Sequence, residues 1–317
     1  DMDGASVGDE WNSGERITVT LTDNDANLNA LTDEDLDVNN AAVKLVPSIR
    51  VGSPITLSGL DGITLQFPTG ALTATTTGGN NNGKAFIQSF SDRARLSLNA
   101  DQTAFTSFVV WFNTTTTSAD LEKYIANGTT NSIYHYLNYD MRSFGSLFTS
   151  GTTTLNFTLT NSSAVGAGQV IPNFAQSTSA SGLVRLGGTN TFSTTNIGGG
   201  TAGLDFGVNF TNSGSTAVAV TAGNYTAVLD IFKFGTDNDG VDFSDRFNNA
   251  IYRAELEETD DNTGVFVGDI EYIMLNQLNT NNTATYESIR SISDNLQIIV
   301  NEDFTDEDSV RINYLDL

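Results

Sequence analysis

The sequence predicts a mainly β fold, and three observations support this class. Apolar and polar residues alternate with a period of two along many segments, which places one set of side chains on a core face and the other in water. Thr, Ser, Asn and Gly are abundant and there are only 4 prolines, a mixture typical of strands joined by many turns. An apolar content of 38% disfavours a disordered chain.

The clearest alternation lies in residues 251–275, which we predict to form a β-hairpin. In its first strand the apolar set is Tyr252, Ala254 and Leu256, while Arg253 is expected to face water. The turn at 260–264 (DDNTG) supplies residues that tolerate positive φ. Because a lone hairpin is marginal in water, other strands must cover its apolar face.

Alternation or short apolar runs predict further strands at 16–23, 43–57, 105–112, 152–160, 204–210, 217–221, 224–234, 296–300 and 310–314. A helix is predicted at 118–126, where Leu121, Tyr124 and Ile125 share one face. The aromatic segment 133–148 fits either helix or strand, and the glycine-rich segment 182–200 is expected to form loops.

Charge divides the chain into three parts. Residues 1–50 hold 11 acids and 3 bases (net −8), residues 51–229 hold 7 acids and 6 bases (net −1), and residues 230–317 hold 20 acids and 5 bases (net −15). We therefore predict one discontinuous acidic domain, 1–50 plus 230–317, interrupted by a near-neutral, mostly β inserted domain at 51–229 with little helix. Three tandem domains of differing charge are the alternative.

Composition excludes several classes of function. A net charge of −24 opposes binding to nucleic acid and favours attraction of cations. The chain has no cysteine, and its single histidine, His135, removes most Ser-His and zinc-site schemes. No apolar run approaches the roughly 18 residues of a membrane span. No signal peptide is present and both ends look cut, so we expect a fragment of a longer mature protein.

Three separated segments carry a resemblance to a known family: Ile17–Asn27, Leu256–Phe266 and Asp308–Asp316. Together they resemble the repeating immunoglobulin-like domains of surface-layer (S-layer) proteins of ammonia-oxidising archaea. Those repeats begin with a TVTLTDxDAN strand and loop, continue with an LEETGxNTGVF hairpin and end with a DxxxVxYxD strand. The matched regions cover about a third of the chain. Asp260 stands where the family often has Gly.

The resemblance implies an immunoglobulin-like antiparallel β-sandwich in an extracellular lattice at the archaeal cell surface. It implies a structural, non-catalytic protein that self-associates in two dimensions, with ammonium as the relevant cation. The alternative function is a cell-surface adhesin or carbohydrate-binding module. Trp111, Tyr134, Tyr136 and Tyr139 could stack on sugar rings in such a module, although core packing is the plainer interpretation.

Acidic loops suggest calcium sites, because Ca²⁺ prefers carboxylate and amide oxygens. The first candidate set is Asp23, Asp25, Asn27 and Glu34, in which Leu28 occupies the position where a helix-loop-helix calcium loop needs Gly. The second set is Asp237, Asp239 and Asp242, and a weaker third comprises Asp303, Asp306, Glu307 and Asp308. The alternative for each set is a solvated acidic loop.

No pair of residues predicts catalysis. Glu257 and Glu258 are adjacent on a strand, so their carboxylates point to opposite faces and are expected to be surface charges. His135 is interpreted as a packed or surface residue.

Asn-x-Ser/Thr sequons in an exported chain predict glycosylation on exposed loops. There are seven: Asn113, Asn127, Asn156, Asn161, Asn209, Asn224 and Asn281.

Overall fold

A computed structural model describes residues 11–68, 70–76, 82–126, 133–145, 153–161, 170–186, 203–213, 218–235, 241–242, 245–246, 248–278, 282–301, 303–304 and 308–315. The fold is mainly β, as the sequence predicts. The α-helices in the described ranges are short: α1 (Ser118–Ala126), α2 (Arg142–Gly145) and α3 (Thr283–Glu287). No helix in these ranges is long and apolar enough to cross a membrane.

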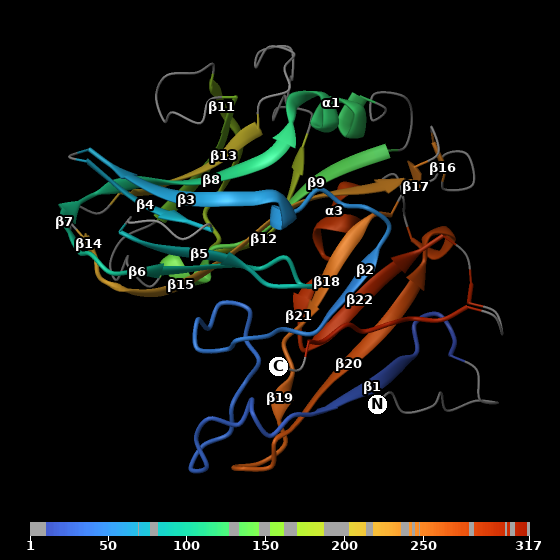
Figure 1. Ribbon diagram of the computed structural model, residues 1–317. Helices are drawn as coiled ribbons and strands as arrows, with labels where there is room; N and C mark the ends of the chain where they lie inside the picture. Colours follow the sequence, from blue (N-terminus) through green and yellow to red (C-terminus); the bar gives the residue numbers. More distant parts are fainter. Residues whose placement is uncertain are drawn as a thin grey trace.

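The largest element is an eleven-stranded sheet in the order β11-β10-β13-β8-β3-β4-β5-β6-β15-β9-β12 (Figure 1). Its strands are β3 (Leu60–Phe67), β4 (Gly70–Thr75), β5 (Gly83–Ile87), β6 (Ala94–Leu98), β8 (Ser107–Thr117), β9 (Ile133–Asp140), β10 (Thr153–Thr160), β11 (Val170–Ser177), β12 (Ser181–Leu186), β13 (Gly203–Asn212) and β15 (Gly223–Gly235). Neighbours are antiparallel except β4 and β5, which pair in parallel.

This sheet curls around one apolar core, so we call it the large body. The core is formed by alternate residues of the strands, as in the buried set Leu65, Val110, Phe112 and Val208. Strands such as β5 and β6 bury only one parity, which explains their alternation of apolar and polar residues. Phe108 and Phe210, on neighbouring strands, stack with ring centroids 4.9 Å apart.

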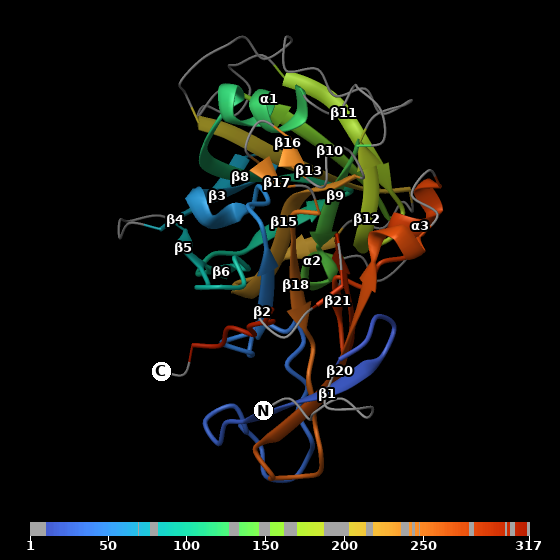
Figure 2. The same ribbon diagram turned by 90° about the vertical axis from the view of Figure 1, so that its right-hand side faces the viewer.

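A second group of strands forms the small body, to which both ends of the chain contribute (Figures 1 and 2). One sheet holds β1 (Arg16–Thr22), β19 (Glu257–Glu258), β20 (Val265–Met274) and β22 (Asn295–Val300). The other holds β2 (Ser48–Val51), β18 (Ala250–Ala254) and β21 (Ile292–Ser293). β22 runs parallel to β20, and β21 runs parallel to β18, while the other pairs are antiparallel.

The two sheets enclose a second core. Most of its members come from the first fifty residues and from residues beyond 249, among them Ile17, Val19, Tyr252, Phe266 and Ile298. Val310 and Ile312 are partly buried against the same core. Residues 16–22 and 310–314 therefore pack on one core, although almost three hundred residues separate them in the sequence. Assignment of the small body to the immunoglobulin-like class remains a prediction.

Strand β15 joins the two cores because both of its faces are buried. Leu229 and Ile231 point into the first core, while Phe232 and Phe234 of the opposite parity point into the second. Tyr136 of β9 also enters the second core. The predicted boundaries near residues 50 and 230 thus lie close to a strand that both bodies share.

The remaining elements are short. Strands β7 (Gln102–Phe105) and β14 (Val218–Val220) pair with each other, as do β16 (Val241–Asp242) and β17 (Asp245–Arg246). Single 3₁₀ turns occur at Leu57–Gly59 and Leu275–Gln277. The helix predicted at 118–126 is confirmed as α1. The ambiguous segment 133–148 contains both types, since β9 is followed by α2.

Two predicted elements differ from the structure. Residues 251–275 are not one hairpin: β18 pairs in one sheet, and after Ala254 the chain crosses to the other sheet, where β19 pairs with β20. Residues 310–314 form no strand but a single bridge between Asn313 and Ser48. Their alternation reflects partial burial against the second core.

Two other predictions fail on burial and on local structure. Arg253 does not face water but is fully buried, because its guanidinium group reaches Asp230 of β15 in the large body. The start of the predicted loop segment 182–200 is strand β12, which pairs with β9. The rest of that segment, from residue 187, lies outside the described residues.

Candidate functional site

The best-defined functional candidate is the acidic loop, residues 23–45, which follows β1 in the small body. Asp23 N–H donates to Gly264 O at 2.9 Å, and Asn27 Nδ2 donates to Asn262 Oδ1 at 3.2 Å. The Tyr314 hydroxyl donates to Asp23 Oδ2 at 2.5 Å. The start of this loop therefore contacts both the β19–β20 turn and the last described segment of the chain.

The β19–β20 turn has the backbone that its sequence predicts. Asn262 and Gly264 both adopt positive φ, at 60° and 62°. A Cβ on Gly264 would lie 2.6 Å from Asn24 Oδ1, so the acidic loop packs directly on the turn. Only glycine meets both requirements at this position.

Glu258 holds this arrangement together. Its Oε1 accepts hydrogen bonds from Gly264 N at 2.7 Å and Thr263 N at 2.8 Å, and its Oε2 accepts one from Glu34 N at 3.2 Å. Burial acts to raise the pKa of Glu258, but these backbone hydrogen bonds, with that from the Thr263 hydroxyl, lower it overall. The expectation that Glu258 is a surface charge is wrong, since its side chain points into the turn and only 6% of the residue is exposed.

The first predicted calcium set is not gathered around one point. Asp23 Oδ1 accepts from Asp25 N at 2.9 Å, and Glu34 Oε2 accepts from Leu28 N at 3.2 Å, so these carboxylates organise separate parts of the loop. Asn27 is directed to the neighbouring turn. Among the described residues no group of three or more His, Cys, Asp or Glu is placed to hold a metal ion.

The other predicted sets lie largely outside the described residues. Asp237 and Asp239 lie outside the described residues. Asp242 is described only as a member of strand β16. In the third set, Asp306 and Glu307 are not described, whereas Asp303 accepts a hydrogen bond from the Tyr272 hydroxyl.

A different acidic cluster, missed from the sequence, lies at the far side of the loop. Asp35 bridges Glu257 of β19 through the backbone. Partial burial and then the charges of Asp37 and Asp33 raise the pKa of Asp35. Desolvation, and then Asp35, Asp294, Asp33 and Asp37, raise the pKa of Glu257. Repulsion among carboxylates therefore makes this cluster a place where a nearby cation is favourable.

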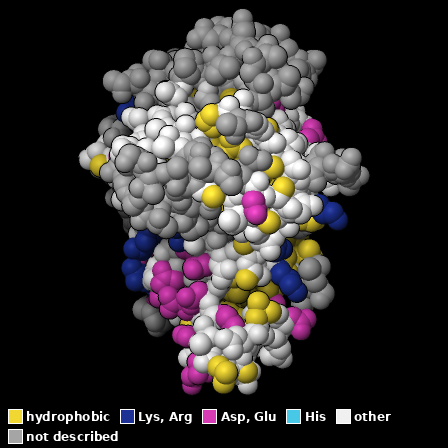
Figure 3. Space-filling view, turned by 90° about the vertical axis from the view of Figure 1, so that its left-hand side faces the viewer, with side chains coloured by type: hydrophobic (Ala, Val, Ile, Leu, Met, Phe, Trp, Pro, Cys, Tyr) yellow, Lys and Arg dark blue, Asp and Glu magenta, His cyan; other side chains and the backbone are white. Residues whose placement is uncertain are grey.

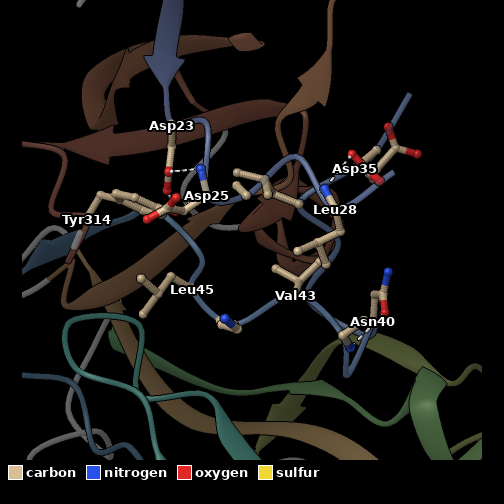
Figure 4. Close-up of a pocket in the computed structure, with 13 residues that line it drawn as sticks. Asp23, Asp25, Leu28, Asp35, Asn40, Val43, Leu45 and Tyr314 are labelled. Atoms are coloured by element: carbon tan, nitrogen blue, oxygen red, sulfur yellow. Dashed lines mark hydrogen bonds between the residues drawn. The ribbon is translucent and has the colours of Figure 1, made fainter. Parts of the chain in front are cut away.

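The acidic loop encloses a pocket of about 320 Å³, which we call the loop pocket (Figure 4). Its apolar wall includes the side chains of Leu28, Leu36, Val43 and Leu45. Its charged lining consists of four acids and one base, Asp23, Asp25, Glu34, Asp35 and Lys44, with Tyr314 at one side. The pocket therefore combines an apolar wall with a net negative lining.

The residues considered for sugar stacking are mostly buried. Trp111, Tyr136 and Tyr139 are 6%, 0% and 1% exposed, and Trp111 Nε1 donates to Gln66 Oε1 at 3.0 Å. Tyr134 is half-buried, with the Arg185 guanidinium 4.8 Å from its ring centre. These rings belong to packed regions rather than to an exposed platform.

His135 is a packed residue, one of the two interpretations made from the sequence. Its Nε2 lies 3.2 Å from Tyr124 O. Burial, and then the charge of Lys233, lower the pKa of His135 to about 4, so the ring is neutral at pH 7.

The predicted glycosylation sites differ in exposure. Asn224, at the start of β15, is exposed, whereas Asn113, Asn156, Asn161 and Asn209 are half-buried. Asn156 and Asn209 face each other across β10 and β13. Asn127 and Asn281 lie outside the described residues.

Comparison with known proteins adds no assignment. Neither a scan against models of protein families nor a search of curated proteins finds a match to this chain. Any functional interpretation therefore depends on the fold, the acidic loop and the sequence resemblance.

Proposed function

We propose that this chain is a structural, non-catalytic segment of an S-layer protein that assembles into a lattice at the cell surface. The observation that carries the proposal is the meeting of three distant segments. The segments that resemble the S-layer repeat, 17–27, 256–266 and 308–316, contact one another through Asp23, which bonds to both Gly264 and Tyr314. In the family the three motifs belong to one repeat. Here the described parts of the three matching segments all belong to the small body.

In this proposal the acidic loop gives the outer surface or the pore walls a negative potential. With a net charge of −24 for the whole chain, such a surface would concentrate cations close to it. Salt limits the effect to about 8–10 Å at physiological ionic strength. Ammonium is the cation that the resemblance suggests. Calcium would act by reducing repulsion between carboxylates of the loop and of neighbouring subunits.

Electron microscopy tests the proposal. The intact protein that carries this chain is incubated with and without millimolar Ca²⁺, and ordered two-dimensional sheets are expected with calcium. A chelator should then dissolve or disorder the sheets. Protein that stays dispersed under every cation condition would contradict the lattice role, and sheets unaffected by chelation would contradict the role of calcium alone.

The second candidate is a cell-surface adhesin or carbohydrate-binding module. Burial of Trp111, Tyr136 and Tyr139 removes the stacking surface that this function was expected to use. Specific binding on a glycan array by protein that forms no sheets would favour it over the structural role.

A further inference from the structure

Large apolar side chains exposed to solvent occur in two places in the described part of the chain. Five such side chains are at least a third exposed: Leu28, Leu31, Phe86, Phe90 and Leu315. Leu28 lines the loop pocket, Leu31 belongs to the same acidic loop, and Leu315 follows Tyr314, which also lines the pocket. Phe86 and Phe90 lie on the β5–β6 hairpin, residues 83–98. Apolar surface collected in this way is typical of contact sites.

The β5–β6 hairpin presents a basic and aromatic surface. On β5 the exposed positions alternate with buried ones, so Lys84 and Phe86 share the outer face. Phe86 is 49% exposed and Phe90 is 45% exposed. The hairpin therefore places two phenyl rings and an ammonium group in water.

Phe90 is held out by a strained backbone. Its φ is +66°, in the left-handed region that bulky residues rarely adopt. Such strain costs on the order of 1–3 kcal/mol and persists only where the surroundings impose it. Here Ser91 O accepts from Arg253 Nε at 2.7 Å, and Asp92 accepts from Thr56 Oγ1 at 2.5 Å, which fixes the turn. The turn that carries this exposed ring is thus held in place by its neighbours.

The loop pocket is complementary to this hairpin in size and charge. A cavity of about 150 Å³ holds one benzene ring, so the 320 Å³ pocket has room for about two. Its lining holds four carboxylates against the single ammonium of Lys44, which favours an occupant that carries a positive charge.

The hairpin and the pocket lie side by side on one molecule. Phe86 is directly opposite Arg95 in the β5–β6 ladder, and Arg95 Nη2 donates to Ala41 O at 3.0 Å. Ala42, the next residue, lines the pocket. Figure 3 shows apolar and acidic side chains gathered together on the part of this face below the large body.

From this placement we infer that a second copy of this chain docks here, with the β5–β6 hairpin of each copy in the loop pocket of the other. When two complementary patches lie beside each other on one face, a two-fold axis brings each patch of one copy onto the other patch of the second copy. The same contact then forms twice. Phe86 would enter the apolar wall of the partner's pocket, and Lys84 would approach its carboxylates. The inference rests on the proposed function, because it supplies one of the contacts by which copies would associate.

Sedimentation velocity of the 317-residue chain tests the contact, from micromolar to about millimolar protein. Salt near 0.15 M reduces the repulsion between acidic copies beyond about 8 Å but leaves a docked contact in place. We expect a monomer–dimer equilibrium. Phe86→Ser should weaken the dimer about tenfold or more, because a buried aromatic anchor contributes strongly to an interface.

Charge reversal gives a second, independent test on an exposed side chain. Lys84→Glu should weaken the dimer about tenfold, and adding Glu34→Lys should recover part of the loss. Arg311→Glu makes the same change in net charge away from the hairpin and should leave the dimer constant nearly unchanged. Circular dichroism confirms that each variant is folded.

The inference would be overturned if the chain stayed monomeric over the whole concentration range. It would also be overturned if Phe86→Ser and Lys84→Glu dimerised like the parent, or if the chain remained a monomer and its pocket bound only an unrelated peptide that carries Lys and Phe. Sheets that still form with Phe86→Ser and Lys84→Glu would also remove this contact, while leaving the lattice proposal intact. A dimer sensitive to these variants in a protein that never forms sheets would support the contact and remove the lattice proposal.

Discussion

Arg253 and Asp230 form a fully buried, two-pronged ion pair between the two bodies. Arg253 Nη1 lies 2.6 Å from Asp230 Oδ2, and Nη2 lies 3.1 Å from Oδ1. Neither side chain is exposed. Asn138 Nδ2 donates to Asp230 Oδ2 at 2.9 Å, and Ser291 Oγ donates to Asn138 Oδ1 at 2.9 Å. The network joins β18 to strands β9 and β15 of the large body.

Removal of one partner of this pair should be strongly destabilising. Asp230→Asn or Arg253→Met leaves the other group buried without its counter-charge, which costs about 3–5 kcal/mol in the free energy of unfolding. Urea denaturation monitored by fluorescence measures the change. The double variant Asp230→Asn with Arg253→Met should be less destabilised than the sum of the two single changes, because no unpaired charge remains.

An exposed ion pair provides the control for this prediction. Arg16 lies 3.4 Å from Glu271 with half of its side chain exposed. Arg16→Met should change the free energy of unfolding by only about 0–1 kcal/mol. Equal effects at Arg16 and Arg253 would contradict a role for burial.

Glu258 and Glu257 should respond in opposite ways to the same substitution. Glu258→Gln keeps one oxygen for the N–H groups of Thr263 and Gly264, but it removes the negative charge and replaces the oxygen that accepts from Glu34 N with an NH2 group, which should cost about 1–3 kcal/mol. Glu257→Gln should be neutral or slightly stabilising, because it removes one of several mutually repelling carboxylates. Thermal unfolding of both variants at pH 7 compares them directly.

The effect at Glu258 should depend on pH. Its pKa is lower in the folded protein than the usual value of 4.5, so its contribution is fully present above that value. The contribution is lost as pH falls through the lower, folded pKa. The gap in stability between the parent and Glu258→Gln should therefore be constant from pH 7 to about 5 and shrink at more acid pH. A gap that widens on acidification would contradict this assignment.

Part of the fold can be predicted from periodicity, because strands such as β1 and β6 bury only one face. The strands at residues 16–22, 153–160 and 203–212 begin and end within two residues of the predicted ranges. Strand β18 could not be interpreted in this way. All five of its residues are buried, and the charged one among them, Arg253, points inward to a partner on another strand.

The candidate site was predictable only in part. Sequence spacing locates the acidic loop, since its carboxylates are close together along the chain. It could not show that Glu257 joins Asp33, Asp35 and Asp37, because the contact links residues more than two hundred positions apart. The role of Glu258 depends on the three-dimensional turn, and the loop pocket depends on Tyr314 from the far end of the chain.

Buried His135 should make the protein less stable as the solution becomes mildly acid. Its folded pKa of about 4 is below the unfolded value of 6.5, so between these values the unfolded state binds the extra proton. Stability should fall by at most about 1.4 kcal/mol per pH unit over this range from this group. His135→Asn should flatten the slope between pH 6.5 and 5. As the chain has one histidine, its single imidazole NMR signal should not titrate above pH 5.

Asp35 should lower stability at neutral pH, and cations should offset that effect. Desolvation, and then repulsion from Asp37 and Asp33, disfavours its charge in the folded state, so Asp35→Asn should raise the free energy of unfolding by about 0.2–1 kcal/mol at low salt. The gain should fade as salt screens the cluster. Millimolar Ca²⁺ should raise the melting temperature of the parent more than that of Asp35→Asn. Asp61→Asn, an exposed acid on the large body, is the control, and the same calcium response in all three proteins would contradict a role for the acidic loop in attracting cations.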